Sequence, residues 1–418
     1  MHHKRFNPTI LFVRFGLNIL FSATLFIQNG VAQDWAQFLG NGTGHCNKNI
    51  TFPKQFPKEG PKILWQKNIG SGWAGPVVQD KKLIIFHRLQ EHEIVECLNV
   101  SSGESVWKSS YLTAYIDDFQ FDDGPRATPI IHKESVFTLG AAGDLTAWEM
   151  ATGKKIWSKN IMKQYQVPKN FFGVGASGII WKDRLIINVG GKGSGVVAFD
   201  CKTGKEIWKT SNQQASYSSP ILIDSGKQSQ IAVYTRQGLL LLDPELGKVL
   251  YEFPWQPRIR SSVNAASPVF AQNQYFISCC YGQGGIALQL KENQLTEVWK
   301  SSDLSCHYNT PIFMDGYIYG IDGRQEESPA LCCFDWKSGK EQWRKTQFPC
   351  SHLLLANKTF LALTEKGELQ LFAANPVKYE PLDSAKILKA PVRAAPAISN
   401  QSLFARDHDK LIAVSLQE

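Results

Sequence analysis

Short apolar runs alternate with turn residues along the chain from about residue 63 to its end. Runs of this length, bounded by Gly, Pro, Asn or Asp, are typical of β-strands. A small residue, often followed by Pro, precedes the first run of each unit, and these openings recur 41 to 53 residues apart. The eight openings are Gly75-Pro76, Thr128-Pro129, Ser177-Gly178, Ser219-Pro220, Ser267-Pro268, Thr310-Pro311, Ser351-His352 and Ala395-Pro396. The pattern predicts eight similar β units, and no stretch shows a long helical period.

A second marker closes most units. It consists of Asp or a substitute, a turn containing Gly, and an aromatic residue four positions after that Gly, as in Asp200, Gly204 and Trp208. Asp can bond its own backbone in such a turn, and Gly supplies the positive φ. We expect the aromatic residue to begin a fourth strand and to pack on the neighbouring unit. The aromatic positions are Trp107, Trp157, Trp208, Tyr251, Trp299 and Trp343, and the turn before Trp299 has lost its Gly.

A period of 40 to 50 residues with four short strands is the signature of a propeller blade. The last unit stops at Leu411–Val414 without its Trp strand, whereas Ile63–Lys67 is a Trp strand with no unit before it. Joining the two completes an eighth blade and removes exposed sheet edges. The sequence therefore predicts an all-β fold: an eight-bladed propeller of four-stranded antiparallel blades over residues 61–418, closed by an N-terminal strand. The stretch Lys378–Leu388 departs furthest from the repeat.

Residues 1–32 have the pattern of a secretory signal peptide. Lys4 and Arg5 precede an apolar stretch from Phe15 to Ile27, and Gly30-Val31-Ala32 supplies the small residues of a cleavage site. An uncleaved anchor is the alternative. No later segment approaches 18 apolar residues, so we expect no transmembrane span. Residues 33–60 then form an N-terminal extension, and the mature protein is expected to be periplasmic or extracellular.

The charge distribution bears on nucleic-acid binding, and the cysteine content bears on disulfides. Three of the eight net positive charges lie in the leader, and the rest are scattered without a basic cluster, which disfavours nucleic acid. The nine cysteines sit mostly in apolar strand patterns. Export permits disulfides, but an odd number favours small buried hydrophobes, and whether any are bridged stays open. We expect a monomer.

The Asp-x-x-x-Gly-x-x-x-Trp turn, as in Asp200 to Trp208 and Asp335 to Trp343, resembles the repeat of pyrroloquinoline quinone (PQQ)-type propellers. That superfamily includes quinoprotein alcohol dehydrogenases and the outer-membrane assembly lipoprotein BamB. The segment Asp34–Gly42 resembles the start of secreted PQQ-like repeat proteins of planctomycete-type bacteria. The resemblance covers residues 34–416, and it implies the fold more strongly than a function.

The loop before the innermost strand of each blade forms one rim of a propeller. The residues three or four positions before the second residue of each opening, usually Pro, are therefore candidate ligand contacts. They include two arginines, three aromatic residues, a histidine and an asparagine, which suit a planar anionic ligand. The alternative is that these side chains merely fill the ring. The candidates are Trp73, Arg126, Tyr217, Asn264, His307, Tyr308 and Arg393.

One long loop, Tyr111 to Pro125, carries paired carboxylates. Asp122 and Asp123, with Asp117 and Asp118 before them, are weak candidates for binding Ca²⁺. Carboxylates in a solvated loop are the alternative explanation.

Two functions remain open. The first is a non-catalytic exported scaffold that binds a protein or a small ligand, with a BamB-like role at the outer membrane as one version and no cofactor. The second is a PQQ- and Ca²⁺-dependent dehydrogenase, which the resemblance allows. Family members often hold the quinone against a disulfide of adjacent cysteines, but Cys279-Cys280 and Cys332-Cys333 fall in apparent strands, where neighbouring side chains point to opposite faces.

Overall fold

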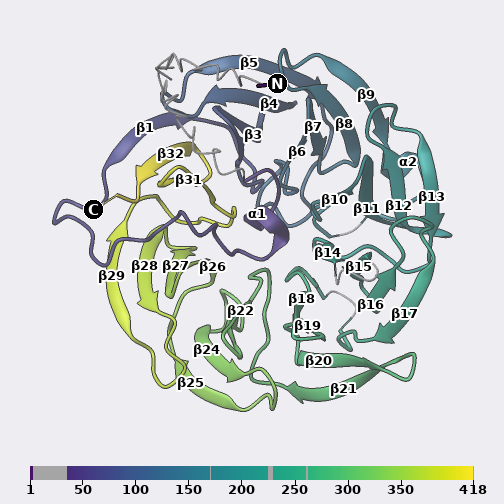
Figure 1. The fold of residues 1–418 in the computed structure, drawn as a ribbon. Helices are drawn as coiled ribbons and strands as arrows, with labels where there is room; N and C mark the ends of the chain where they lie inside the picture. The colour runs from purple at the N-terminus through teal and green to yellow at the C-terminus, as the bar shows by residue number, and fades with distance from the viewer. Residues whose placement is uncertain (3–34, 170, 225–228, 260–261, 418) are drawn as a thin grey trace. The chain divides into compact units, whose positions relative to one another are not determined.

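The computed structural model describes residues 1–2, 35–169, 171–224, 229–259 and 262–417. The predicted signal peptide lies outside these residues apart from its first two. The compact unit Ala32–Glu418 contains all the described residues from position 35 onward. These residues form eight four-stranded antiparallel sheets, each of which is one blade, and the blades are arranged as a ring (Figure 1). The fold class predicted from the sequence is confirmed.

The blades follow one another along the chain, and each runs from an innermost to an outermost strand. Blade 1 contains β2 (Val77–Gln79), β3 (Lys82–Leu89), β4 (His92–Asn99) and β5 (Ser105–Leu112). Blade 2 contains β6 (Ile130–His132), β7 (Ser135–Leu139), β8 (Asp144–Glu149) and β9 (Lys155–Asn160). Blade 3 contains β10 (Ile179–Trp181), β11 (Arg184–Gly191), β12 (Ser194–Asp200) and β13 (Glu206–Thr210). Blade 4 contains β14 (Ile221–Asp224), β15 (Ser229–Tyr234), β16 (Gly238–Leu242) and β17 (Val249–Pro254).

The second half of the ring repeats this order. Blade 5 contains β18 (Val269–Ala271), β19 (Gln274–Cys279), β20 (Gly284–Lys291) and β21 (Gln294–Ser301). Blade 6 contains β22 (Ile312–Met314), β23 (Tyr317–Asp322), β24 (Ala330–Asp335) and β25 (Glu341–Lys345). Blade 7 contains β26 (Ser351–Ala356), β27 (Thr359–Thr364), β28 (Glu368–Ala373) and β29 (Pro381–Lys386), so the stretch that departs from the repeat still supplies an outermost strand.

Blade 8 joins the two ends of the propeller. Its inner strands are β30 (Ala397–Ser399), β31 (Ser402–Arg406) and β32 (Lys410–Ser415), and its outermost strand is β1 (Ile63–Asn68). The β1 strand pairs antiparallel with β32, with Trp65 opposite Ala413 and Lys67 opposite Leu411. Strand β2 of blade 1 in turn contacts β30 of blade 8 as well as β6 of blade 2. The predicted closure by an N-terminal strand is therefore present.

The middle strands are apolar on both faces because each blade is packed between two others. Leu239 and Leu241 of β16 pack with residues of blade 5, and Leu240 and Leu242 pack with residues of blade 3. All four are fully buried. Successive side chains of a strand point to opposite faces, so a continuous apolar run fills both inter-blade cores.

The closing turn of each unit links neighbouring blades. In blade 3 the Asp200 carboxylate accepts the N–H of Thr203 at 2.7 Å, and Gly204 takes a φ of +68°. The Trp157 ring of blade 2 packs on that Gly and donates its indole N–H to the Cys201 carbonyl at 3.0 Å. We call the tryptophans whose indole N–H donates to a carbonyl of the next blade in this way the tryptophan belt. Its members, with their acceptor carbonyls, are Trp65 (Val100), Trp107 (Met150), Trp157 (Cys201), Trp208 (Pro244), Trp299 (Trp336) and Trp343 (Asn375). All of them except Trp343 also pack on a Gly of that turn.

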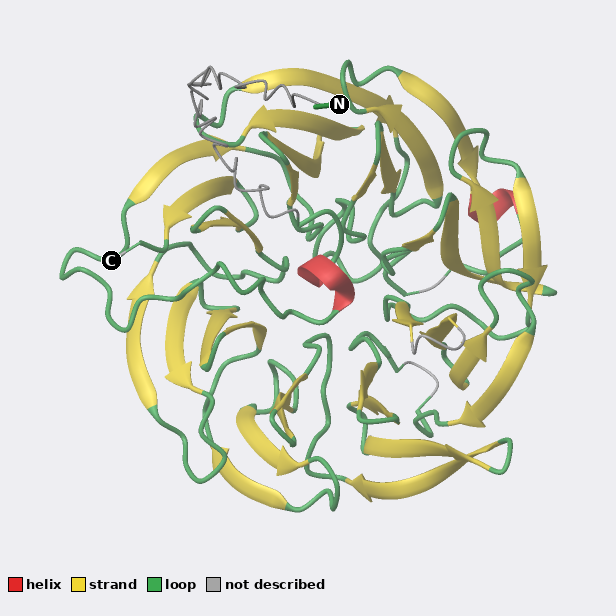
Figure 2. Cartoon of the chain, in the orientation of Figure 1, coloured by secondary structure: helices red, strands yellow, loops and turns green. Residues whose placement is uncertain are grey.

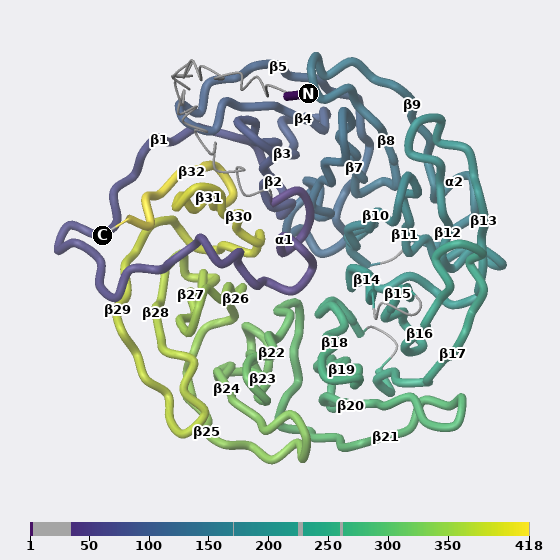
Figure 3. Tube along the Cα trace, in the orientation of Figure 1, coloured from purple at the N-terminus to yellow at the C-terminus, as the bar shows by residue number. Residues whose placement is uncertain are grey.

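The described part of the N-terminal extension, residues 35–60, runs across the innermost strands. Trp35 pairs with Val78 of β2, and Cys46 donates its backbone N–H to Leu355 of β26 at 2.8 Å. Between them the one-turn helix α1 (Leu39–Gly42) lies near the centre of the ring (Figure 2), and the path of the segment is clear in the tube view (Figure 3). The only other helix of the described residues is α2 (Ile161–Gln164). The extension thus covers the ends of several innermost strands.

Candidate functional site

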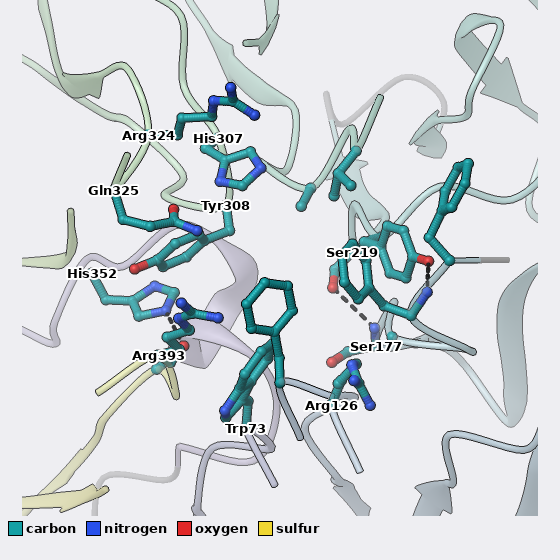
Figure 4. A pocket seen from close by; sticks show the side chains of 18 of the residues that line it. Trp73, Arg126, Ser177, Ser219, His307, Tyr308, Arg324, Gln325, His352 and Arg393 are labelled. Atoms are coloured by element: carbon teal, nitrogen blue, oxygen red, sulfur yellow. Dashed lines mark hydrogen bonds between the residues drawn. The ribbon is translucent and has the colours of Figure 1, made fainter. Parts of the chain in front are cut away.

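A cavity of about 410 Å³ opens on the propeller axis. Most of its walls come from the loops that precede the innermost strands, and Phe38 of the N-terminal extension also lines it. Figure 4 shows His307, Tyr308, Gln325, His352 and Arg393 on one side, and Arg126, Ser177 and Ser219 on the other. The remaining lining residues are Trp73, Thr128, Phe119, Phe121, Phe171, Phe172, Gly175, Tyr217, Val263, Ala265, Tyr281, Arg324, Glu326 and Ala395.

The structure brings six of the seven sequence-derived candidates together in this cavity: Trp73, Arg126, Tyr217, His307, Tyr308 and Arg393. The exception is Asn264, which is buried and donates its side-chain N–H to the Thr235 carbonyl at 3.0 Å. Its neighbours Val263 and Ala265 line the cavity instead. Counting back from the strand openings therefore predicts which loops line the cavity but not the orientation of every side chain.

Trp73 lies between two arginines. The guanidinium carbon of Arg393 is 4.6 Å from the centroid of the indole, and that of Arg126 is 5.2 Å away. Arg126 is held by its own loop, since it donates to the carbonyls of Asp122 and Gly124 and lies 3.5 Å from the Asp117 carboxylate. Cations over an indole face are stabilised by the ring quadrupole. The stack fixes two positive charges at the cavity wall contributed by blades 1, 2 and 8.

A row of aromatic rings forms the wall on the side of blades 5 to 7. Ring centroids of Tyr281 and His307, of His307 and Tyr308, and of Tyr308 and His352 lie 5.6 to 5.8 Å apart. Burial lowers the pKa of His307 and of His352 to about 4, so both imidazoles are neutral near pH 7. The His352 Nε2–H donates to the Arg393 carbonyl at 2.9 Å, which leaves Nδ1 as an acceptor. Burial raises the pKa of the Tyr308 hydroxyl, which therefore remains a donor.

The wall on the side of blades 2 to 4 is apolar. Phe119 packs against Phe172 with ring centroids 5.1 Å apart, and Phe172 packs against Tyr217 at 5.9 Å. Phe119 and Phe121 remain 50% and 53% exposed, although large apolar side chains are usually buried. These residues were not predicted from the sequence, because they lie inside long loops at no fixed distance from a strand opening. The aromatic pairs Phe119/Phe121 and Phe171/Phe172 in otherwise polar loops were the available signal.

The carboxylates proposed as weak Ca²⁺ ligands are used by the loop itself. Asp122 accepts the backbone N–H groups of Gly72 and Gly124 at 3.0 and 2.6 Å. Asp123 accepts the N–H of Asp117, whose own carboxylate accepts the N–H of Phe121 at 2.9 Å. Among the described residues, no three His, Cys, Asp or Glu side chains are arranged to hold a metal ion. These contacts account for the loop's shape.

The cavity lining does not fit a Ca²⁺-bound quinone. Ca²⁺ usually takes six to eight oxygen ligands, whereas the lining supplies one carboxylate, Glu326, and one amide, Gln325. All nine cysteines are free, including Cys332 and Cys333, which are consecutive residues of β24. Cys280 lies just beyond the end of β19 rather than inside a strand as the sequence suggested. No step of quinone chemistry is derived from this site.

These features define the class of PQQ-like β-propellers. A family model described as outer membrane protein assembly factor BamB matches residues 91–345, and the chain belongs to this family. BamB of Yersinia pestis is 21% identical over 256 residues, which is 59% of this chain and 62% of that protein. The chain thus matches less than two thirds of the length of this relative.

Solved structures show the same fold at low sequence identity. BamB from Moraxella catarrhalis superposes with a TM-score of 0.61 at 13% identity, covering 85% of this chain and 97% of that one. Quinohemoprotein alcohol dehydrogenase from Comamonas testosteroni gives a TM-score of 0.66 at 13% identity, covering 94% and 82%. A europium-containing methanol dehydrogenase gives 0.67 at 13% identity, covering 91% and 89%. At this identity the likeness concerns the fold alone.

Proposed function

We propose that this chain is an exported, non-catalytic propeller that binds a protein partner through the phenylalanine rim, defined as Phe119, Phe121, Phe171 and Phe172. The observation that carries the proposal is the exposure of Phe119 and Phe121 at the mouth of the cavity. Exposed apolar groups bordered by polar residues mark interaction sites, and aromatic residues and Arg are enriched in the centres of protein interfaces.

Charge and neighbouring groups support the same choice. Arg236 lies over the Phe171 ring at 5.6 Å, and Arg393 lies over the Phe121 ring at 5.6 Å. The rim therefore combines rigid aromatic surface with arginines, which is the composition of binding hot spots. Ile116, on the same loop, is 66% exposed and extends the apolar surface.

Family membership and the leader favour a setting at the cell envelope. The family is described by a role in outer membrane protein assembly, and residues 1–32 have the pattern of an export signal. No helix of the described residues is long and apolar enough to cross a membrane. We propose a periplasmic or extracellular protein, peripheral to the outer membrane, that acts as a monomer.

Site-specific photo-crosslinking tests the proposal. A benzoyl-phenylalanine placed at position 119 or 121 is expected to capture a polypeptide in the cell that makes this protein. The matched control is Leu246, which is 69% exposed but lies in the turn between β16 and β17. Crosslinks at the rim and none at Leu246 support a protein-binding rim. Equal crosslinking at both places, or none at the rim, contradicts it.

The dehydrogenase alternative has its own test. PQQ and Ca²⁺ added to the mature protein would raise its melting temperature if a cofactor site existed, because a ligand that binds only the folded state stabilises it. We expect no Ca²⁺-dependent shift at saturating PQQ and no dye-linked alcohol oxidation.

A further inference from the structure

Arg393 differs from the other arginines of the cavity in having no anionic partner. Of the arginines that line it, Arg126 lies 3.5 Å from Asp117, and Arg324 donates to Glu327 at 2.8 Å. Among the described residues, no carboxylate oxygen comes within 4.0 Å of the Arg393 guanidinium, and no side-chain hydrogen bond to it is formed. An arginine left unpaired beside a cavity is available to bind an anion.

The position of this guanidinium is nonetheless fixed. It stacks on Trp73 at 4.6 Å, and the ring of Phe121 lies 5.6 Å away. The backbone of Arg393 is held as well, because its carbonyl accepts the His352 N–H at 2.9 Å. A guanidinium held in one orientation loses little conformational entropy when it binds a carboxylate, so binding is more favourable.

Other unpaired polar atoms lie beside Arg393. The Tyr308 hydroxyl, the Nδ1 atom of His352 and the Nε atom of Arg393 are buried without a hydrogen-bond partner among the described residues. The Tyr308 and His352 rings are 5.6 Å apart, and Figure 4 shows both on the same side of the cavity as Arg393. Buried polar groups are normally paired, so this side of the cavity has hydrogen-bonding capacity that the described residues do not use. The lone pair on His352 Nδ1 is an acceptor and does not contribute to binding an anion. The Glu365 carboxylate interacts with Arg393 through space but lies too far away for an ion pair.

The opposite wall of the cavity is apolar and aromatic. Phe121, Phe172 and Tyr217 present ring surface to the same cavity from the side of blades 2 to 4. The volume of about 410 Å³ is within the range of small-ligand sites. A ligand that satisfies both walls has an anionic group at one end and a flat apolar body at the other.

We propose that the cavity is a binding site for a carboxylate with an aromatic body, in which the carboxylate pairs with Arg393 and the rings lie against Phe121 and Phe172. This site shares Phe121 and Phe172 with the phenylalanine rim, but it depends on Arg393, which protein capture by the rim does not require. The two proposals can therefore fail separately.

Calorimetric titration with 2-naphthoate and with its neutral amide tests the proposal on the full mature chain. The naphthoate is expected to bind at least about tenfold more tightly than 2-naphthamide, since a charge-assisted pair is lost in the amide. Arg393→Gln is expected to weaken naphthoate binding by a similar factor and to remove the preference over the amide. Arg258→Gln is the matched control, because Arg258 is exposed and does not line the cavity.

Two sources of such a carboxylate can be separated. A free aromatic acid predicts that 2-naphthoate binds more tightly than N-acetyl-Phe-Phe, whereas the terminal carboxylate of a polypeptide predicts the reverse. Equal affinity for naphthoate and naphthamide, no binding of either acid, or unchanged binding by a folded Arg393→Gln variant would overturn the proposal. The melting temperature of each variant shows whether it is folded, and the crosslinking result at Phe119 does not affect this outcome.

Discussion

In the tryptophan belt, each indole N–H donates to a carbonyl of the next blade, and most of the rings pack on the same kind of turn. In the axial cavity, by contrast, the blades contribute different side chains, and Arg393, Tyr308 and His352 keep unpaired polar atoms. The belt is regular, and its indole donors all have hydrogen-bond partners. The cavity is irregular, and some of its polar atoms have no partner among the described residues. Regular contacts thus stabilise the ring, and departures from the repeat carry its binding chemistry.

The exceptions in the belt support this division. Blade 4 has Tyr251 in place of a belt Trp, and the following turn of blade 5 has Glu292 and Asn293 in place of Gly. The Gly is needed only where an indole must fit, since a Cβ on Gly247 would lie 2.4 Å from the Trp208 ring. In most of the belt the indole and the Gly therefore form one contact between two blades. Trp343 is the exception, since it donates to Asn375 in a turn that contains no Gly.

The largest expected effect comes from removing a belt indole. Trp208→Ala should lower the free energy of unfolding by about 3–5 kcal/mol, because it opens a cavity between blades and leaves the Pro244 carbonyl unpaired. Tyr251→Ala, at the half-buried position that lacks this contact, should cost about 1–2 kcal/mol. Chemical denaturation measures both, and equal losses would show that the belt does not stabilise the ring more than its substitute.

A smaller loss is expected at the Gly of the same kind of contact. Gly153 has a φ of +73°, and an added Cβ would lie 2.4 Å from the Trp107 ring. Gly193 has a φ of +68° with no atom within 4 Å of that position. Gly193→Ala should cost about 1 kcal/mol through backbone strain alone, and Gly153→Ala about 3 kcal/mol through strain and displacement of the indole. Similar melting temperatures for the two variants would contradict the role given to the indole contact.

The two buried histidines of the cavity should make the stability of the protein depend on pH, which the belt does not do. Burial lowers the pKa of His307 and His352 to about 4, while an unfolded His titrates near 6.5. The folded state binds fewer protons in this interval. Stability should therefore be complete above about pH 6.5 and fall as the pH drops towards 4, by up to about 3 kcal/mol for each ring.

Denaturation of wild type and His352→Gln at pH 7, 5.5 and 4 measures this dependence. The variant should lose less stability than wild type over the interval. His92→Gln is the control, because His92 is exposed and its loss should leave the slope unchanged. A slope unaffected by His352→Gln would mean that burial does not lower the pKa of this ring in the folded protein.

The same division explains what the sequence could predict. Openings such as Ser219-Pro220 and turns such as Asp200 to Trp208 recur with a period, so the blades, their number and the closing strand β1 followed from counting. Trp73 and Arg393 were found because they stand at a fixed distance before an opening.

The remaining residues of the cavity stand at positions that do not recur from one repeat to the next. Phe119 and Phe121 belong to one long loop, and Arg324 follows β23 of a single blade. Asn264 was misplaced because the alternate residues Val263 and Ala265 face the cavity while its amide reaches Thr235. Side-chain direction in irregular loops depends on long-range contacts, which a single sequence does not display.

The smallest effect on stability is expected at the cavity mouth, where the effect on binding should be clear. Phe121 is 53% exposed, so Phe121→Ala should change the free energy of unfolding by less than about 1 kcal/mol. The ring lies 5.6 Å from Arg393, and its loss should weaken 2-naphthoate binding about fivefold through lost apolar contact. Leu246→Ala removes a comparably exposed apolar side chain in a turn outside the cavity lining and should change neither quantity. If Phe121→Ala instead destabilised the fold as strongly as Trp208→Ala, the ring would belong with the belt as a structural element, and the separation of stability from binding would fail.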